Sequence, residues 1–486
     1  MREIEVTSPF AALARCLRSR GAVHDALEGA DDIHSAASRL CDWGAAQWYG
    51  GQFEFRSPWS VGALELFAGV LDLCRLQVLE TTLPGAPICM IAVLADTAMC
   101  STKGGDAGTG EDLELVAGGQ GLSRSEALMS AIGELAERLS LWSMGPDDPR
   151  VFGRKNSGQD MPLAPFIGLS DRQAADLRQR YPALVADADG DGINWNALSR
   201  RRVATTSWLT QGAQGRRVSN LPAFGVLMGE GKGLGLGGLN LVSTSGTAVW
   251  SDREEAARRA LLEVVERDAI GQFWYNRLGI TRIDEAIWRD LIHRNCFEYV
   301  TERHRKTDFY AVDTEFSTHV VAAISREPNG LGACFGSAAR RSVPQAIMSA
   351  LGELLQSERS LALSVQAHMA GGGNRVLPAA VQYASAVNID EDLKLSAAAA
   401  ADAVKLERDY SAEALLESCL QRGIRLHLFD ATRPDLDVPC AKVLSQDLCS
   451  WLPRFGKRRL FEGVLARGWR DTPLCEDDFE LRPFPF

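Results

Sequence analysis

The sequence predicts an α+β fold built by duplication of a strand–helix unit. One helix-like segment occurs three times, and strand-like phrases recur between the copies. The spacing between the helix copies is irregular, which separates this pattern from a solenoid of regular repeats. Sheets that back the repeated helices account for both features. With 486 residues, the chain is long enough to bury a large core and to form two or more domains or one elaborate domain.

Residues 1–80 are predicted to form a mostly helical N-terminal extension. Helices are expected over Phe10 to Arg20, Asp32 to Trp43 and Val61 to Leu79, with a turn at Gly50-Gly51. No pattern with a chemical role is visible in this part, so we expect a scaffold or docking extension. Residues 81–486 form the second predicted domain, which contains all three copies of the helix.

Three strand-like phrases share a Thr-containing turn followed by an apolar run. Thr82 precedes Ile88 to Leu94, and the other two phrases are Asp430 to Leu444 and the weaker Ala311 to Ile324. We expect these phrases to form the sheets. The stretch from Arg150 to about Trp195 is rich in Pro, Gly and Asp, and we expect it to be peripheral.

The three helix copies carry the same acidic pattern. Seven of eleven positions are identical between the first copy, Ala127 to Glu137, and the third copy, Ala346 to Gln356. The second copy begins at Ala256. In the first copy, the apolar residues Leu128, Ile132, Leu135 and Leu139 form one stripe at helical spacing. Three polar residues share another face because positions i, i+3 and i+4 are neighbours on a helix. They are Glu134, Glu137 and Arg138 in the first copy, Glu263, Glu266 and Arg267 in the second, and Glu353 and Gln356 in the third.

Two interpretations of the acidic faces are open. Each face can be an ordinary solvated helix surface, because Glu-rich helices are common. Alternatively, the faces converge on one site for a divalent cation. Carboxylates repel one another and repel phosphate, and Mg²⁺ offsets both repulsions. An adjacent Arg can bind phosphate through two hydrogen bonds.

Two Gly-rich motifs, a helix cap and one cysteine are less specific signals than the acidic helices. Asp187 to Gly192 imitates a calcium loop but has Leu198 where a Glu is needed, so we expect a surface turn. Gly233 to Gly238 forms G-x-G-x-x-G without a helix directly after it, so we expect a flexible loop bordering the site. Ser251 or Asp252 is expected to cap the second helix, and Cys334 to be buried rather than nucleophilic.

Composition excludes several classes of protein. A net charge of −11 argues against a general nucleic-acid binder. The eleven scattered cysteines lack a C-x-x-C pair, which favours reduced thiols in a cytoplasmic protein. No apolar signal core is visible at the N-terminus, and the most apolar run contains Glu65, Asp72 and Arg75. We therefore expect no membrane span.

The motifs resemble those of a known enzyme family. Ser130-x3-Glu134-x2-Glu137-Arg138, Glu263-x2-Glu266-Arg267 and Glu353-x2-Gln356 look like the three nucleotide-binding motifs of the YcaO family. Arg482 to Phe486 resembles the proline-rich tail of its cyclodehydratase members. The resemblance covers about residues 81–486. Within the family, the chain looks most like the cyclodehydratase component of azole-forming, microcin-type thiazole/oxazole synthetases.

The resemblance implies cofactors, roles and partners. It implies an ATP-dependent enzyme in which the five glutamates hold Mg²⁺ and Arg138 and Arg267 contact phosphate. Gln356 would orient a phosphate or a metal-bound water, and Ser130 would contact nucleotide or pack in its helix. A Cys, Ser or Thr of a ribosomally made precursor peptide would become a thiazoline or oxazoline. The implied partners are a leader-binding protein similar to ubiquitin-activating enzymes and an FMN dehydrogenase.

The proline-rich end is predicted to be stiff. Pro483 and Pro485 favour an extended tail that loses little entropy on docking, which would present the Phe486 carboxylate to the site. A frayed terminus is the alternative. Three features depart from the family pattern: the last residue is Phe, Gln120 replaces a common lysine, and Glu358 stands where an arginine is common. A thioamide- or amidine-forming enzyme, or a non-catalytic scaffold subunit, also fits the motifs.

Overall fold

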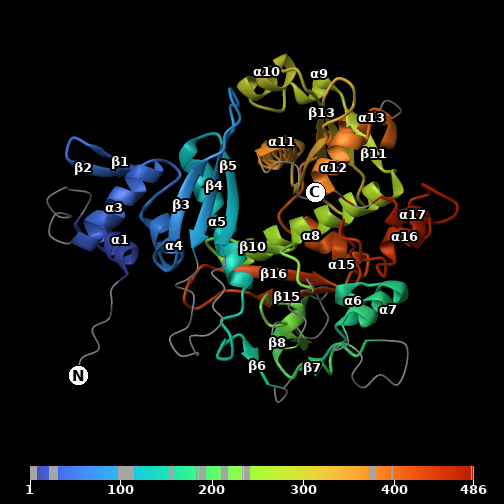
Figure 1. Cartoon of the computed structure of the whole chain (residues 1–486), viewed down its shortest axis with the longest axis horizontal. Helices are drawn as coiled ribbons and strands as arrows, with labels where there is room; N and C mark the ends of the chain where they lie inside the picture. The colour runs from blue at the N-terminus through green and yellow to red at the C-terminus, as the bar shows by residue number, and fades with distance from the viewer. Residues whose placement is uncertain are drawn as a thin grey trace. The chain divides into compact units, whose positions relative to one another are not determined.

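The computed structural model describes residues 8–20, 31–96, 114–153, 158–181, 184, 193–208, 217–231, 234, 241–370, 379–395, 398–482 and 484 (Figure 1). The chain divides into two compact units. Unit 1 comprises Met1–Gly145, Ala248–Ala256 and Ala431–Cys440, and unit 2 comprises the other residues. The predicted boundary at residue 80 falls within unit 1, and that division stays a prediction. Helices and strands alternate in both units, which confirms the α+β class.

Unit 1 begins with a small helical layer and a hairpin. Its elements are α1 (Pro9–Arg20), α3 (Asp31–Trp43), β1 (Ala46–Tyr49), β2 (Gln52–Phe55) and α4 (Val61–Leu73). Gly50 and Gly51 have positive φ angles of 56° and 80° and form the turn of the β1–β2 hairpin. Most of the described residues of the predicted extension are therefore helical, and short strands accompany the helices.

The helix predicted to reach Leu79 ends earlier, at Leu73. Strand β3 (Arg75–Glu80) follows at once and pairs with β4 (Cys89–Asp96) in antiparallel register. Residues 75–78 alternate polar and apolar side chains, and this period of two fits a half-buried strand better than a helix. Because apolar residues are frequent throughout Val61 to Leu79, composition does not reveal that the spacing of these residues changes after Leu73.

The remainder of unit 1 is a three-stranded antiparallel sheet backed by a helix. The strand order is β3-β4-β5, with β5 at Glu114–Gly121 and α5 at Arg124–Leu141. The Ser123 side chain caps α5 by accepting a hydrogen bond from the Glu126 N–H at 3.2 Å. Leu128, Ile132 and Leu135 are fully buried, which confirms the predicted apolar stripe. Their burial leaves the acidic residues at the edge of the helix–sheet contact.

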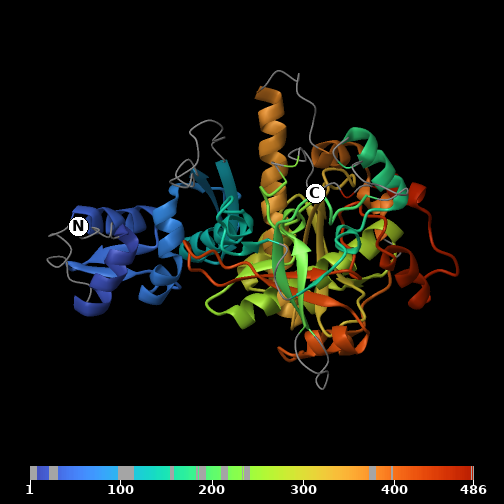
Figure 2. The ribbon, with the colours of Figure 1, turned by 90° about the horizontal axis from the view of Figure 1, so that it is seen from below.

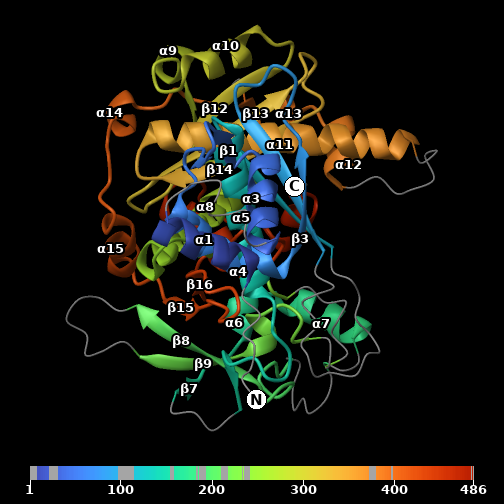
Figure 3. The same ribbon diagram turned by 90° about the vertical axis from the view of Figure 1, so that its left-hand side faces the viewer.

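Unit 2 contains the same arrangement in a larger form. Its four-stranded antiparallel sheet has the order β11-β12-β13-β14, and α11 packs on β13 and β14 (Figure 3). The bounds are β11 (Ile280–Ile283), β12 (Lys306–Val312), β13 (His319–Arg326), β14 (Cys334–Arg340) and α11 (Val343–Ala370). Strand β14 runs into α11 as β5 runs into α5. The structure thus shows the strand–helix duplication that the sequence predicts.

Glycines allow close packing of strand and helix in both copies. A Cβ atom on Gly119 of β5 would lie 2.1 Å from the Ala131 nitrogen of α5. A Cβ atom on Gly336 of β14 would lie 2.2 Å from the Ala350 carbonyl oxygen of α11. Side chains cannot approach backbone this closely, so glycine is required at both positions. The close contact fixes each acidic helix against its sheet.

A seven-stranded sheet and the long helix α8 complete the framework. The sheet has the order β10-β16-β15-β8-β9-β7, with β6 beside β8. Its strands are β6 (Val151–Phe152), β7 (Gln159–Asp160), β8 (Arg202–Trp208), β9 (Val218–Pro222), β10 (Thr247–Val249), β15 (Leu426–Asp430) and β16 (Cys440–Ser445). Helix α8 spans Arg253–Asn276, and the Asp252 side chain caps it by accepting from the Glu255 N–H at 2.8 Å, as expected.

The other helices are short. They are α6 (Ala164–Ile167), α7 (Asp171–Arg180), α9 (Glu285–Trp288), α10 (Arg294–Glu302), α12 (Ala379–Ala386), α13 (Ile389–Asp392), α14 (Ala403–Leu406), α15 (Ala414–Gln421), α16 (Arg459–Ala466) and α17 (Glu476–Glu480), with a 3₁₀ turn at Ala223–Gly225. The last turns of α11 extend beyond its sheet (Figure 2), and most of their side chains are exposed. No helix in the described ranges is long and apolar enough to cross a membrane.

Candidate functional site

In unit 1, the polar face of α5 forms a short hydrogen-bonded chain. The Arg138 Nε donates to Glu134 at 2.8 Å, and its Nη1 donates to the Val116 carbonyl oxygen of β5 at 2.6 Å. Glu137 accepts from the Val249 backbone N–H at 3.1 Å. All three motif side chains are partly exposed and thus accessible to a ligand.

Two further residues of unit 1 bear on the predicted nucleotide contact. Ser130 is exposed on α5, one turn before Glu134, which removes the alternative that it packs inside the helix layer. Gln120, one of the departures from the family pattern, lies on β5. Its Oε1 is buried and finds no hydrogen-bond donor among the described residues. An amide oxygen of this kind fits a ligand contact.

In unit 2, Arg267 lies between the two glutamates of α8. Its Nη2 donates to Glu263 at 3.1 Å, and its Nη1 pairs closely with Glu266. Burial alone would lower the pKa of Arg267, but the carboxylates of Glu266, Glu263 and Glu353 raise it. The arginine therefore stays charged and neutralises part of this cluster.

Glu266 is buried, and backbone and side-chain donors hold its carboxylate. It accepts from the Ser337 hydroxyl at 2.7 Å and from the Ala339 N–H at 2.9 Å, both on β14. Glu263 accepts from the Gly246 N–H at 3.1 Å. These donors fix the position of each carboxylate.

Glu353 of α11 completes the acidic cluster of unit 2. Burial, together with the negative charge of Glu266, raises the pKa of Glu353 to about 8, although Arg267 and Arg340 act in the opposite direction. The Ser337 N–H donates to this carboxyl at 3.3 Å. Gln356 lies one turn further along α11 and is partly exposed. The cluster therefore places three acidic groups beside Arg267 and Arg340, and burial favours the protonated form of one of them, Glu353.

The donor set of this cluster fits a hard divalent cation. Mg²⁺ binds carboxylate oxygens and keeps several waters, so it needs few protein ligands for each ion. Within the described ranges, no three His, Cys, Asp or Glu side chains stand close enough to hold one ion. Arg267 pairs with Glu263 and Glu266, so a cation would compete with it for these two carboxylates. Burial raises the pKa of Glu353, so an additional positive charge nearby would favour its ionised form.

Lys442 supports the loop that reaches Glu263, a role that no sequence motif indicates. This buried side chain of β16 donates to the Ser243 and Ser245 carbonyl oxygens at 2.6 and 3.2 Å and to the Thr247 hydroxyl at 3.3 Å. It thereby holds residues 243–247 in place for the Gly246 contact. Lysines are rarely fully buried, but burial cannot be read from the sequence alone.

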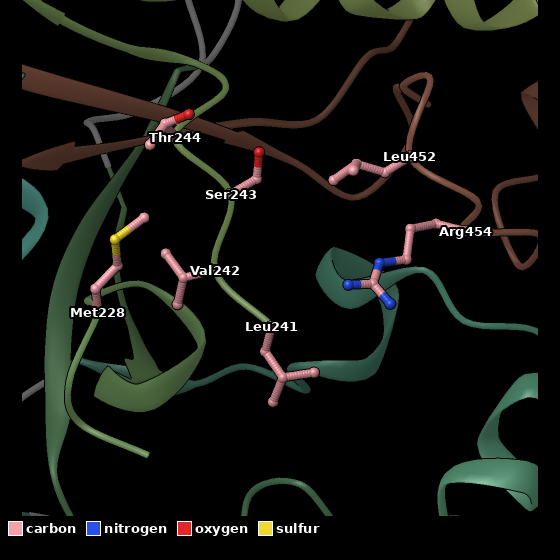
Figure 4. Close-up of a pocket in the computed structure, with 7 residues that line it drawn as sticks. All are labelled: Met228, Leu241, Val242, Ser243, Thr244, Leu452 and Arg454. Carbon is pink, nitrogen blue, oxygen red and sulfur yellow. The ribbon is translucent and has the colours of Figure 1, made fainter. Parts of the chain in front are cut away.

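A cavity of about 180 Å³ in unit 2 adjoins this loop (Figure 4). The Arg454 side chain reaches toward the segment Leu241–Thr244, and burial lowers its pKa. The lining consists of Met228, Leu241, Val242, Ser243, Thr244, Leu452 and Arg454. The cavity therefore combines apolar walls with hydroxyl groups and one guanidinium group.

Glu358, which departs from the family pattern, has a structural partner. It is buried and accepts two hydrogen bonds from Arg303, at 2.8 and 2.9 Å, and one from the Ser325 hydroxyl at 2.5 Å. The Arg305 Nε lies 3.6 Å from the same carboxylate. Cys334 is buried nearby, and burial raises the pKa of its thiol to about 12, in agreement with the expected inert cysteine.

Several predicted features lie outside the described residues. These are the tail residues Pro483, Pro485 and Phe486, the turn at Asp187 to Gly192, and most of the loop at Gly233 to Gly238. Of the five predicted metal ligands, Glu134 and Glu137 belong to unit 1, and the other three belong to unit 2. Unit 2 brings Glu263, Glu266 and Glu353 together around Arg267. That all five glutamates serve one nucleotide stays a prediction.

Comparisons with known proteins agree with the motif resemblance. The family model described as YcaO cyclodehydratase, ATP- and Mg²⁺-binding, matches residues 118–449. This description confirms the two expected cofactors, ATP and Mg²⁺. The matched residues include the acidic segments of α5, α8 and α11. Among curated proteins, no match is found.

Solved structures share the fold at low sequence identity. A heterocyclase in complex with substrate and cofactor has a TM-score of 0.66 and 19% identity, covering 87% of this chain and 56% of that chain. YcaO from Methanopyrus kandleri, bound with AMPPCP and Mg²⁺, has a TM-score of 0.51 and 19% identity, covering 76% of this chain and 85% of that chain. The heterocyclase TruD has a TM-score of 0.54 and 21% identity, covering 75% of this chain and 51% of that chain.

The chain thus spans only about half the length of the two heterocyclases. Identities at this level support a shared fold and carry no residue roles by themselves. The family assignment rests instead on the family model, which matches more than half of the sequence. Because that model spans all three acidic helix segments, the chain belongs to the YcaO family of ATP- and Mg²⁺-binding cyclodehydratases.

Proposed function

We propose that the protein is an ATP-dependent cyclodehydratase that converts Cys, Ser or Thr residues of a ribosomally made precursor peptide into thiazolines or oxazolines. The observation that carries this proposal is the cluster of Glu263, Glu266 and Glu353 around Arg267, inside the segment that matches the family. An acidic cluster with an embedded arginine is suited to a magnesium–phosphate ligand, which supplies both the missing positive charge and an anion for the arginine.

The proposed roles follow from the chemistry of each side chain. Glu134, Glu137, Glu263, Glu266 and Glu353 would hold Mg²⁺ through carboxylate oxygens. Arg138 and Arg267 would bind phosphate oxygens, Gln356 would orient a phosphate or a metal-bound water, and Ser130 would contact nucleotide. ATP supplies the phosphoryl group that makes the peptide amide oxygen a leaving group. The residues of this chain position the reactants and stabilise charge.

The tail and the partners belong to the same proposal. Pro483 and Pro485 would deliver the carboxylate of Phe486 to the reacting amide. The peptide would be presented by a leader-binding protein similar to ubiquitin-activating enzymes, and an FMN dehydrogenase would oxidise the ring, as in a microcin-type synthetase. The heterocyclase solved with substrate and cofactor supports a substrate that binds alongside a cofactor. A cytoplasmic location also stays a prediction.

The test is reconstitution with purified components. The chain is mixed with ATP, Mg²⁺, a Cys- and Ser-containing precursor peptide and the candidate leader-binding protein, and peptide mass and phosphate release are followed. We expect the peptide to lose one water for each ring, with matching ATP consumption. Little product should form without the leader-binding protein. Full-rate turnover by the isolated chain would contradict the role of the partner.

A second candidate function is a non-catalytic subunit of the synthetase. Two of the departures from the family pattern favour it: Gln120 stands in place of a lysine, and Glu358 forms a buried ion pair with Arg303. This alternative predicts that the complete complex consumes no ATP through this chain. Thioamide-forming activity would consume ATP and raise the peptide mass, because sulfur replaces the amide oxygen. Amidine-forming activity would consume ATP and use an amine, leaving the Cys, Ser and Thr side chains unmodified. Phosphate release and the fragment masses of the peptide together separate the outcomes.

A further inference from the structure

Trp451 of unit 2 contacts both the arginine of the acidic cluster and a residue near the C-terminus. The Arg267 Cζ lies 3.7 Å from the centroid of the indole ring. Phe484 stacks on the same indole at a centroid distance of 4.8 Å, with the ring planes 4° apart. Both contacts use the faces of the ring. One side chain therefore joins Arg267 to Phe484.

Neighbouring groups fix the position of Trp451. The Tyr275 hydroxyl donates to the Trp451 carbonyl oxygen at 2.6 Å. The Trp274 ring packs edge-on against Phe484 at 5.1 Å, and its Nε1 donates to the Arg482 carbonyl oxygen at 2.8 Å. Trp274 and Tyr275 are fully buried. Trp274 follows Arg267 by two helical turns, so both lie on one face of α8.

A guanidinium group binds a ring and an oxyanion through different parts. The flat face rests on the aromatic ring, whereas the N–H groups at the edge donate to oxygen atoms. In Arg267 the edge is engaged by Glu263 and Glu266, and the face lies on Trp451. The arginine can therefore exchange carboxylates for phosphate at its edge without leaving the ring.

We propose that Trp451 is a positioning residue for the nucleotide. It holds the plane of Arg267 while the donors of this arginine pass from Glu263 and Glu266 to a phosphate group. Phe484 stacks on Trp451 and supports it. The packing of Phe484 on Trp451 should therefore favour nucleotide binding. Nucleotide binding should favour that packing to the same extent, because such coupling is reciprocal. This inference rests on the proposed function, because it needs Arg267 to bind the phosphates of ATP.

The test compares binding of magnesium–ATP in full-length variants by titration calorimetry. Trp451→Leu removes the aromatic face, and we expect the Kd to rise about tenfold, which corresponds to about 1.4 kcal/mol. Trp451→Phe keeps a face for the guanidinium and should restore the Kd to within about threefold of the wild type. Phe484→Leu should weaken binding in the same direction but less. Phe461→Leu is the matched control, because Phe461 packs on Phe479 in the same apolar cluster.

A purely structural role for Trp451 predicts a different pattern. Trp451→Leu and Phe461→Leu would then both lower the Tm and the active fraction, with the Kd for magnesium–ATP unchanged in both. A double-mutant cycle gives a second check: the effects of Arg267→Lys and Trp451→Leu on the Kd should be less than additive, because lysine cannot use the ring face in the same way. Additive effects would overturn the inference.

The result for the wild type separates this inference from the proposed function. If the wild type binds no magnesium–ATP, the proposed function fails and the role of Trp451 fails with it. If the wild type binds and Trp451→Leu binds equally well, only the positioning role is overturned. Weaker binding in Trp451→Leu, with recovery in Trp451→Phe, supports both.

Discussion

Replacing Glu353 with glutamine should change how the stability of the protein depends on pH. Burial and the charge of Glu266 raise the pKa of Glu353 from 4.5 to about 8. Between these values the carboxyl is protonated in the folded state and ionised in the unfolded state, so the folded state binds more protons. Stability is therefore lost as the pH rises toward 8, and the loss levels off above it.

The size of this effect follows from the shift. One pKa unit corresponds to about 1.4 kcal/mol, and the whole shift would amount to about 5 kcal/mol. Glu353 is partly exposed, so solvent screening reduces this figure, and we expect about 1–3 kcal/mol. Glu353→Gln keeps the shape of the side chain and removes the titration. The free energy of unfolding of the variant, minus that of the wild type, should grow between pH 6 and pH 8.

Urea unfolding at a series of pH values measures this difference directly. Glu298→Gln is the control, because Glu298 lies in an exposed ion pair with Arg294 and should change stability by less than about 0.5 kcal/mol at any pH. Parallel pH profiles for the wild type and Glu353→Gln would refute the reasoning. If Glu353 binds Mg²⁺, affinity for magnesium–ATP in the wild type should also rise between pH 6.5 and pH 8, because the ion displaces a proton.

Three further outcomes are expected. In urea unfolding, Gly336→Ala should lower the free energy of unfolding by more than about 2 kcal/mol, because the new Cβ would lie 2.2 Å from a backbone oxygen of α11. Gly153→Ala is the control and should have almost no effect, because no atom of the described residues, apart from its chain neighbours, lies within 4 Å of its new Cβ. Glu358→Ala should destabilise by about 3–5 kcal/mol, because it leaves the Arg303 charge without its buried partner, and an unchanged Tm would contradict this. Extending the chain beyond Phe486 should reduce ring formation while ATP binding persists, and normal ring formation by the extended chain would rule out a role for the terminal carboxylate. Deleting Pro483 to Phe486 should also reduce ring formation, but it should weaken magnesium–ATP binding as well, because the deletion removes Phe484 from Trp451.

Features with a local cause could be predicted from the sequence. The stripe through Leu128 and Ile132 and the cap at Asp252 depend on residues within a few positions of one another, and the structure has both. The helix is predicted to continue to Leu79 because apolar residues continue through β3. Only the spacing of these apolar residues changes after Leu73, where α4 ends. The alternation of residues 75–78 is the available signal.

Contacts between distant parts of the chain could not be predicted. Ser337 donates to Glu266 across 71 positions, and Lys442 holds a loop almost 200 positions earlier in the chain. Trp451 reaches Arg267 by the same kind of tertiary contact. The repeated glutamates were found because duplication places one local pattern in three segments. Their supporting residues occur once each and leave no pattern of spacing.

The central claim is that the glutamates of α5, α8 and α11 bind ATP through Mg²⁺. The most direct measurement is ATP binding by calorimetry, with and without Mg²⁺, for the wild type and for Glu134→Gln, Glu263→Gln and Glu353→Gln, alongside Glu298→Gln as the control. We expect Mg²⁺-dependent binding in the wild type and the control, and its loss in the three motif variants, with circular dichroism spectra unchanged in all four variants. Wild-type affinity in the three motif variants would contradict the claim.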